Sequence, residues 1–317
     1  MAAYVARRTL IAIPVLLIIS IIIFLLAHAA PGGPLARYLL NPHLSRGAIL
    51  QIEHNLGLDK PIWYQYLVWL KQIVTGQWGT SLLTGQPVIQ MIGEALPNTL
   101  ILMVTALVLT ILIAIPLGIL QALRQYSIFD YIFTGVAFFG FAMPTFFLAV
   151  VVLIVFAADL GWFPAGGMAQ AGVPLTIGDL LHHLVLPACT LAFISIASYS
   201  RYLRSQMLEV LTLDYIRTAR AKGLPPFRVT LKHAVRNALL PVITIFALDI
   251  AFIFQGAVLT EYVFAWPGMG RLLLSALEGG DYPLIMIGYM MAAALVVVFN
   301  LVADVVYAAV DPRISYA

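Results

Sequence analysis

The chemically most distinctive segment of the chain is a basic stretch between two apolar regions. Eight of the seventeen Lys and Arg residues lie between positions 201 and 237. They surround the run Asp214-Tyr-Ile-Arg-Thr-Ala-Arg-Ala-Lys-Gly-Leu224. A guanidinium group can bind a carboxylate through paired hydrogen bonds, and it also donates to carbonyl oxygens. The segment is therefore suited to binding a surface of another molecule that offers such oxygens.

If residues 214 to 224 form a helix, the run has two chemically different faces. One face carries residues spaced four apart, two of them small: Tyr215, Ala219 and Gly223. The opposite face carries Arg217, Arg220 and Leu224. Small residues permit close approach of another backbone, and Gly223 followed by Leu-Pro-Pro226 predicts a sharp helix end. The pattern indicates a short docking helix, and the alternative is an ordinary basic loop attracted to anionic lipid.

The amino-acid composition indicates whether the elements that position this segment are surrounded by water or by lipid. Hydrophobic residues make up 62% of the 317-residue chain, charged residues make up 10%, and the mean hydropathy is +0.99. A water-soluble surface cannot enclose such a chain, so an integral membrane protein is expected. The net charge of +3 follows the membrane topology, so no nucleic-acid partner is predicted. The one cysteine, Cys189, can form no intrachain disulfide.

Six charge-poor stretches are long enough to cross a hydrocarbon core of about 30 Å. They lie near residues 9–29, 98–121, 131–158, 184–203, 238–260 and 283–308. Each must be helical, because unpaired backbone amides are too costly in lipid. The sequence thus predicts an all-α polytopic membrane protein with six transmembrane helices.

The basic residues of the short connections predict the orientation. They precede the first span, follow the second, fill the 204–237 loop and follow the sixth, so both termini are expected to be cytoplasmic. The expected organisation is an N-terminal region with span one (1–30), a long extracytoplasmic loop (31–97), a core bundle of spans two to six (98–308) and a cytoplasmic tail (309–317). Two amphipathic helices are predicted in the long loop, one opened by Pro61 and one from Pro87 to Leu96.

Motifs for catalysis are absent from the sequence. There is no Gly-Lys dipeptide for a phosphate-binding loop, no HExxH, no CxxC pair and no GxSxG. His182 and His183 are adjacent and would point to different sides of a helix, which disfavours a metal site. No catalytic residue, metal ligand or bound cofactor is predicted.

Ionisable residues inside the spans are costly and are often functional. Asp249 falls at the centre of span five, and Asp304 lies near the cytoplasmic end of span six. An intramembrane aspartyl hydrolase would need such a pair, but the surrounding residues of Asp249 do not match a Gly-x-Gly-Asp motif. Asp304 is interpreted as a structural partner of a cytoplasmic arginine. Asp249 either lines a pathway or makes a hydrogen bond between helices, and Gln255 is the other candidate for lining a pathway.

Motifs along nearly the whole chain resemble one known family. Tyr215 to Leu224, with Asn237-Ala-Leu-Leu-Pro241 after it, resembles the cytoplasmic EAA loop of bacterial ABC-importer permeases of the dipeptide, oligopeptide and nickel group. Further similar motifs are Gly79-Thr-Ser81, Leu96-Pro-Asn-Thr-Leu100, Glu261-Tyr-Val-Phe-Ala-Trp-Pro-Gly-Met-Gly-Arg271 and Asp311-Pro-Arg-Ile314. The long first outer loop is similar to that of the first, B-type permease subunit. The namesake glutamate is absent, since Arg217-Thr218 precedes Ala219, and this form is common in the peptide group.

The resemblance implies a type I ABC importer transmembrane domain that provides half of a pathway for peptides. Its coupling helix would dock on a cytosolic ATPase through Tyr215, Ile216, Arg217, Thr218, Ala219, Arg220, Ala221, Lys222, Gly223 and Leu224. The implied partners are a second permease subunit in a heterodimer, two ATPase subunits that bind ATP and magnesium, an extracytoplasmic substrate-binding protein and membrane lipid. The implied location is a bacterial or archaeal plasma membrane. The same architecture could import nickel chelates or oligosaccharides, and the rival class is an ion-coupled secondary transporter.

Overall fold

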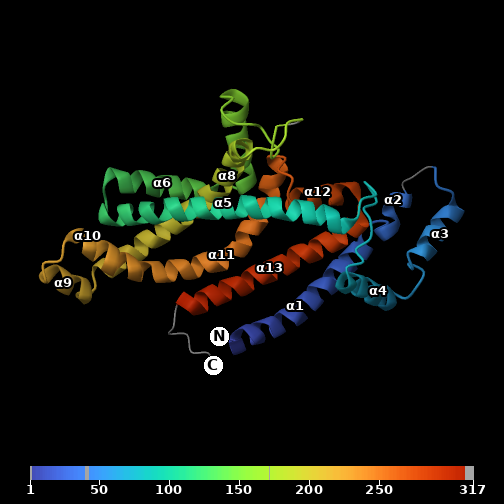
Figure 1. Ribbon diagram of the computed structural model, residues 1–317, viewed down its shortest axis with the longest axis horizontal. Helices are drawn as coiled ribbons and strands as arrows, with labels where there is room; N and C mark the ends of the chain where they lie inside the picture. The colour runs from blue at the N-terminus through green and yellow to red at the C-terminus, as the bar shows by residue number, and fades with distance from the viewer. Residues whose placement is uncertain (1, 40–42, 171, 311–317) are drawn as a thin grey trace. The chain divides into compact units, whose positions relative to one another are not determined.

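The computed structural model describes residues 2–39, 43–170 and 172–310, without the side chains of residues 2–5, 36, 244, 247–256 and 306–310. Every named element in these ranges is a helix, and the only extended pairing is an isolated bridge between Thr80 and Pro87. The helical elements dominate Figure 1. The predicted all-α class is confirmed.

Five long helices and a set of shorter ones make up the described chain. The long ones are α1 (Ala2–Ala29), α5 (Val88–Leu123), α8 (Ile177–Leu211), α11 (Arg236–Val263) and α13 (Tyr282–Val310). The shorter ones are α2 (Ala36–Leu39), α3 (Arg46–Asn55), α4 (Ile62–Thr75), α6 (Ile128–Ala142), α7 (Thr145–Val152), α9 (Asp214–Ala221), α10 (Pro226–Arg228) and α12 (Met269–Gly279). A 3₁₀ turn occupies Gly33–Leu35, and wider π-helical turns occupy Leu153–Asp159 and Val229–Val235.

Within the described ranges, four helices are long and apolar enough to cross a membrane: Ala6–Ala29, Val88–Leu123, Ile177–Leu211 and Tyr282–Val305. The bent pair Ile128–Ala142 and Thr145–Asp159 is a fifth if it is counted as one span. The chain is therefore a multi-pass helical membrane protein. The remaining predicted span, 238–260, lies in α11, where ten consecutive side chains are outside the description. The six-span count and the cytoplasmic location of both termini stay predictions.

The third predicted span is not a straight helix. It is divided into α6 and α7, whose axes differ by 110°. The break falls at Met143 and Pro144, and Met143 has an extended backbone with ψ of 124°. A proline disfavours helical geometry in the residue before it and donates no backbone hydrogen bond. These two effects explain why an uninterrupted apolar run turns at this point.

Two amphipathic helices were predicted before span two. The first is α4, which begins directly after Pro61 as expected. The second, predicted from Pro87 to Leu96 and leading into span two, is the start of α5, which continues from Val88 through Pro97 to Leu123. The helical face of α4 that packs inward carries Tyr66, Trp69 and Ile73, which lie against Phe24 of α1.

The chain divides into two compact units, and α5 and α13 contribute residues to both. One unit comprises Ala2–Asn98 and Gly268–Val298. Its fully buried Asp281 accepts hydrogen bonds from the Ser81 hydroxyl and, at 3.0 Å, from the Leu82 amide. This carboxylate fixes the tight loop around Ser81 at the start of α13.

The other unit comprises Thr99–Pro267 and the chain from Phe299 onward. In this unit α5 and α8 approach so closely that a Cβ on Gly118 would lie 2.7 Å from the Ser200 carbonyl oxygen, so only glycine fits there. A bidentate ion pair joins helices α6 and α8. Arg204 donates to both oxygens of the Asp130 carboxylate, at 2.7 Å from Nε and at 2.6 Å from Nη2. The α9 and α10 segments lie beyond the C-terminal end of α8 (Figure 1).

Candidate docking site

The basic segment forms the short helix α9, and its end has a defined hydrogen-bond pattern. The Gly223 amide donates to the Arg220 carbonyl at 2.9 Å, and the Leu224 amide donates to the Ala219 carbonyl at 3.4 Å. Gly223 has a φ of +72°, the left-handed conformation that closes a helix in this motif. Pro225 and Pro226 follow, so the chain cannot continue as the same helix. The predicted sharp helix end is confirmed.

One face of α9 is buried against its own chain. Ile216 is completely buried and Ala219 is 6% exposed. Both belong to an apolar cluster that also contains Met207 of α8 and Val229 and Ala234 of the π-helical turn. Leu224 packs against the same cluster and thereby supports the helix end. The helix is therefore held on the body of this unit rather than projecting freely.

This packing differs from the sequence expectation for Ala219. The expected stripe of small residues offered Ala219 to another protein, whereas the structure places it inside the chain's own core. Sequence spacing relates residues to one another around a helix, but it does not say which face the rest of the chain will cover. Ile216 was the signal that could have identified the covered face, because a large aliphatic side chain in a basic segment favours burial.

The opposite face of α9 is exposed and carries most of the predicted docking residues. These are Tyr215, Arg217, Thr218, Arg220, Ala221, Lys222 and Gly223. Among the described residues, Arg217 has one ionic contact, at 3.5 Å with the exposed Asp214 carboxylate, and this weak contact leaves its guanidinium available for other acceptors. With Arg220 and Lys222 it makes this face cationic.

A hydrogen bond from the beginning of α11 fixes the position of Tyr215. The Asn237 side-chain amide donates to the Tyr215 hydroxyl at 3.1 Å and to the His233 carbonyl at 2.8 Å. Asn237 thus connects α9 to the segment that follows it. The sequence identified Asn237 only as part of a motif, and its positioning role comes from the structure.

Two further pairs of residues were considered in the sequence, Asp249 and Gln255 as pathway residues and two adjacent histidines that were not expected to bind a metal. The side chains of Asp249 and Gln255 lie outside the described residues, so their predicted places in a pathway stay predictions. His182 and His183 have different partners, since His182 Nε2 lies 3.0 Å from the Trp162 carbonyl and His183 Nδ1 lies 2.9 Å from the Asp179 carbonyl. Among the residues that the structure describes, no group of three His, Cys, Asp or Glu side chains could hold a metal ion.

The described chain is thus a multi-pass helical protein with a short cationic helix, α9, anchored on its own apolar cluster. The fold is similar to that of a chain in inward-facing structures of the MetNI methionine ABC transporter, with a TM-score of 0.57 and 16% identity. The match covers 71% of this chain and 98% of that one.

Sequence comparisons define the family. Residues 114–316 match the family described as binding-protein-dependent transport system inner membrane component, and residues 1–103 match its N-terminal component. The chain belongs to this family of ABC importer permeases.

Two of the similar relatives match the chain over its full length. The chain is 47% identical over 317 residues to the oligopeptide transport system permease protein AppB of Bacillus subtilis (strain 168), and the match covers 100% of both chains. It is 40% identical over 334 aligned residues to the dipeptide transport system permease protein DppB of Alkalihalophilus pseudofirmus, again with 100% of both covered.

Proposed function

We propose that this permease forms half of the translocation pathway of an ATP-driven importer of peptides. The choice of peptides is supported by the relatives, which match the chain over its whole length and are permease proteins of oligopeptide and dipeptide transport systems. The second half of the pathway is a different permease subunit, and a separate extracytoplasmic protein delivers the substrate. The membrane is the plasma membrane of a bacterium or archaeon.

The observation that carries this proposal is the geometry of α9. Its apolar face, Ile216 and Ala219, is fixed in the chain's own core, and its cationic face is exposed. A helix held in this way moves together with the cluster beneath it, so a force applied at its exposed face reaches α8 and the start of α11. This is the mechanical arrangement that coupling to a cytosolic ATPase requires.

The chain itself hydrolyses nothing under this proposal. ATP and magnesium bind to two partner ATPase subunits, and this chain binds no cofactor. Arg217, Arg220 and Lys222 present the donors that would contact carboxylates and carbonyl oxygens on the ATPase. Tyr215 and Gly223, at the two ends of the same exposed face, set how closely the two proteins approach.

Charge reversal on α9 tests the proposal in the complete transporter. The double variant Arg217→Glu/Arg220→Glu should lose copurification with the ATPase subunits and lose ATP-driven uptake of radiolabelled dipeptides and tripeptides. The matched control is Arg124→Glu, an exposed arginine between α5 and α6, which should retain both. Full ATPase association in the double variant would remove the docking role.

The substrate and the energy source are tested separately. Uptake of nickel chelates or oligosaccharides in place of peptides, by the same complex, would keep the ATPase coupling and change the substrate class. Transport by the purified chain alone in liposomes under an ion gradient would replace the importer with a secondary transporter.

A further inference from the structure

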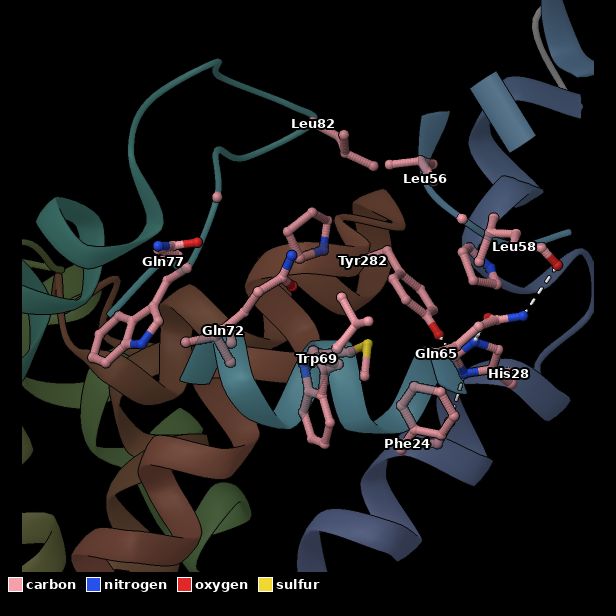
Figure 2. A pocket seen from close by; sticks show the side chains of 18 of the residues that line it. Phe24, His28, Leu56, Leu58, Gln65, Trp69, Gln72, Gln77, Leu82 and Tyr282 are labelled. Atoms are coloured by element: carbon pink, nitrogen blue, oxygen red, sulfur yellow. Dashed lines mark hydrogen bonds between the residues drawn. The ribbon is translucent and has the colours of Figure 1, made fainter. Parts of the chain in front are cut away.

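A cavity of about 510 Å³ lies in the unit that contains α1, α4 and the start of α13. Its other walls are the segment from Gln77 to Leu82, the turn of residues 56–58, and Pro34 and Tyr38. Figure 2 shows side chains from these elements facing a common space. Natural ligand pockets have volumes of about 300–1,000 Å³, so this one is large enough to hold a ligand. It is remote from α9 in sequence, and the proposed ATPase coupling makes no use of it.

One wall of the cavity is a fixed hydrogen-bond network. The Gln65 amide nitrogen donates to the carbonyl oxygens of Leu58 and Lys60 at 3.0 and 2.8 Å. The Gln65 side-chain oxygen therefore accepts from His28 Nε2 at 3.1 Å. His28 Nδ1 lies 2.9 Å from the Tyr282 hydroxyl (Figure 2). The network joins α1, α4 and α13, so this wall is formed before any ligand arrives.

Trp69 lines the cavity through its ring, and its indole nitrogen is enclosed within the wall and does not face the cavity. Gln72 and Gln77 place two amide groups along the lining (Figure 2). An occupant with an acceptor oxygen would suit these two glutamine amides.

The described lining of the cavity contains no carboxylate, ammonium or guanidinium group. All of its residues are described, and none is Asp, Glu, Lys or Arg. The polar members are amides, hydroxyls and His28, and the rest of the wall is aliphatic or aromatic. Burying an unpaired charge is costly, so the cavity disfavours phosphate, free carboxylate and the charged termini of a peptide. The occupant that fits is a long apolar group with an uncharged acceptor at one end.

The lining residues lie near the end of a membrane span, which indicates that a membrane lipid is the occupant within reach. Phe24 and His28 lie in the last two turns of the membrane span Ala6–Ala29. The adjoining α4 is rich in the residues that favour the headgroup boundary: Trp63, Tyr64, Tyr66 and Trp69. At this depth a phospholipid presents its ester carbonyls and the beginning of its acyl chains.

We propose that this cavity binds one acyl chain of a membrane phospholipid. The acyl chain lies against Phe24, Val68 and Met286. The ester carbonyl oxygen accepts a hydrogen bond from the side-chain amide of Gln72 or Gln77. The charged phosphate remains outside, in agreement with a lining that offers no Lys or Arg to pair with it. The ligand class is therefore defined by its acyl chain and ester and not by its headgroup.

Photolabelling in liposomes tests this site with the full-length chain. The probe is a phosphatidylcholine with a diazirine on one acyl chain, and labelled residues are located by peptide mass spectrometry. We expect saturable labelling of cavity side chains that unlabelled phosphatidylcholine suppresses and that a phosphatidylglycerol probe reproduces. Val68→Phe places a larger side chain in the cavity and should reduce this labelling about tenfold.

The matched control is Val74→Phe on the same helix, because Val74 is 81% exposed and does not line the cavity. It should label like the unaltered chain. A second pair keeps the test independent of the folding of one variant: Leu56→Trp fills the cavity, and Leu50→Trp, on α3 and outside the lining, does not. Labelling of the cavity residues that rises in proportion to the probe concentration without saturating would overturn the proposal. This is the behaviour expected of a lipid-exposed residue such as Leu10 of α1. Equal labelling in the cavity-filling and control variants would also overturn it.

Discussion

At the residue scale, Gly223 serves two roles that the structure separates. Its φ of +72° closes α9, and a Cβ built there would meet no atom of the chain within 4 Å. A side chain at this position therefore costs backbone strain of about 1–2 kcal/mol without any clash inside the chain. Asparagine tolerates the left-handed conformation better than most residues, so it can keep the turn while adding bulk to the exposed face.

We expect Gly223→Asn to fold with nearly unchanged thermal stability and yet to lose ATPase association, because its side chain separates the docking surfaces. Gly223→Gln should lose association and also unfold at lower temperature. Copurification with the ATPase and thermal unfolding of the complex measure the two effects. If Gly223→Asn associates fully, the glycine serves only the turn of its own chain.

Ala219 is the residue at which sequence and structure differ most informatively. Because it is 6% exposed within the core cluster, Ala219→Leu should destabilise the complex by about 1–3 kcal/mol through overpacking. The control is Ala221→Leu on the exposed face of the same helix, which should leave stability nearly unchanged. Thermal unfolding measures both. Equal stability of the two variants would contradict the burial of Ala219.

The sequence predicted the extent of α9 and its end well, because helix stop signals are local. It did not predict which face is covered, because that depends on Met207 and Val229, which reach α9 from separate segments. Asn237 illustrates the same limit, since its hydrogen bond to Tyr215 joins residues 22 positions apart. Sequence periodicity predicts how residues are arranged around one helix, whereas the face that is buried depends on a second segment that packs against it.

At the element scale, the apolar spans were predictable and their geometry was not. Runs of hydrophobic residues predict α1, α5, α8 and α13 because lipid demands helices of this length. The 110° turn between α6 and α7 lies inside one such run, where composition gives no sign of direction. The proline at 144 was the available local signal, but prolines at 97 and 187 occur within helices that continue. The outcome depends on how neighbouring helices hold each proline.

Breaking the ion pair between α6 and α8 by removing one partner is expected to destabilise the protein. Asp130 is 2% exposed, and Arg204 donates to both of its carboxylate oxygens. Removing one partner of a buried pair costs about 3–5 kcal/mol, because the other charge is left unpaired. Asp130→Asn and Arg204→Met should each lower the unfolding temperature strongly.

The double variant Asp130→Leu/Arg204→Met is the control for this pair. It removes both charges together, so it should recover much of the stability lost in either single variant. Thermal unfolding of all three variants in one detergent completes the cycle. Additive losses in the double variant would mean that the two residues act independently.

At the scale of the whole molecule, the family assignment and the local geometry support each other. Relatives match the chain from end to end. The N-terminal region, the outer loop and the start of α13 belong to one of the two compact units. Within this unit they share an apolar cluster. The proposed lipid cavity lies in that unit, and the docking helix lies in the other.

The orientation of the chain in the membrane decides whether both proposals can hold together. The positive-inside pattern predicts that α9 and α10 lie in the cytosol and that α3 lies on the other side of the membrane. Cys189 is the one cysteine, so a Cys189→Ser background permits single reporters. Gln51→Cys on α3 and Arg228→Cys on α10 place reporters at exposed positions on the two expected sides.

We expect a membrane-impermeant maleimide to label Gln51→Cys in intact cells and Arg228→Cys only after the membrane is permeabilised. The cysteine-free background should remain unlabelled in both conditions. Labelling of Arg228→Cys in intact cells would reverse the orientation and place α9 where no cytosolic ATPase can reach it. Because the lipid cavity needs only a membrane boundary near the end of α1, that proposal would survive the reversal, and the docking proposal would not.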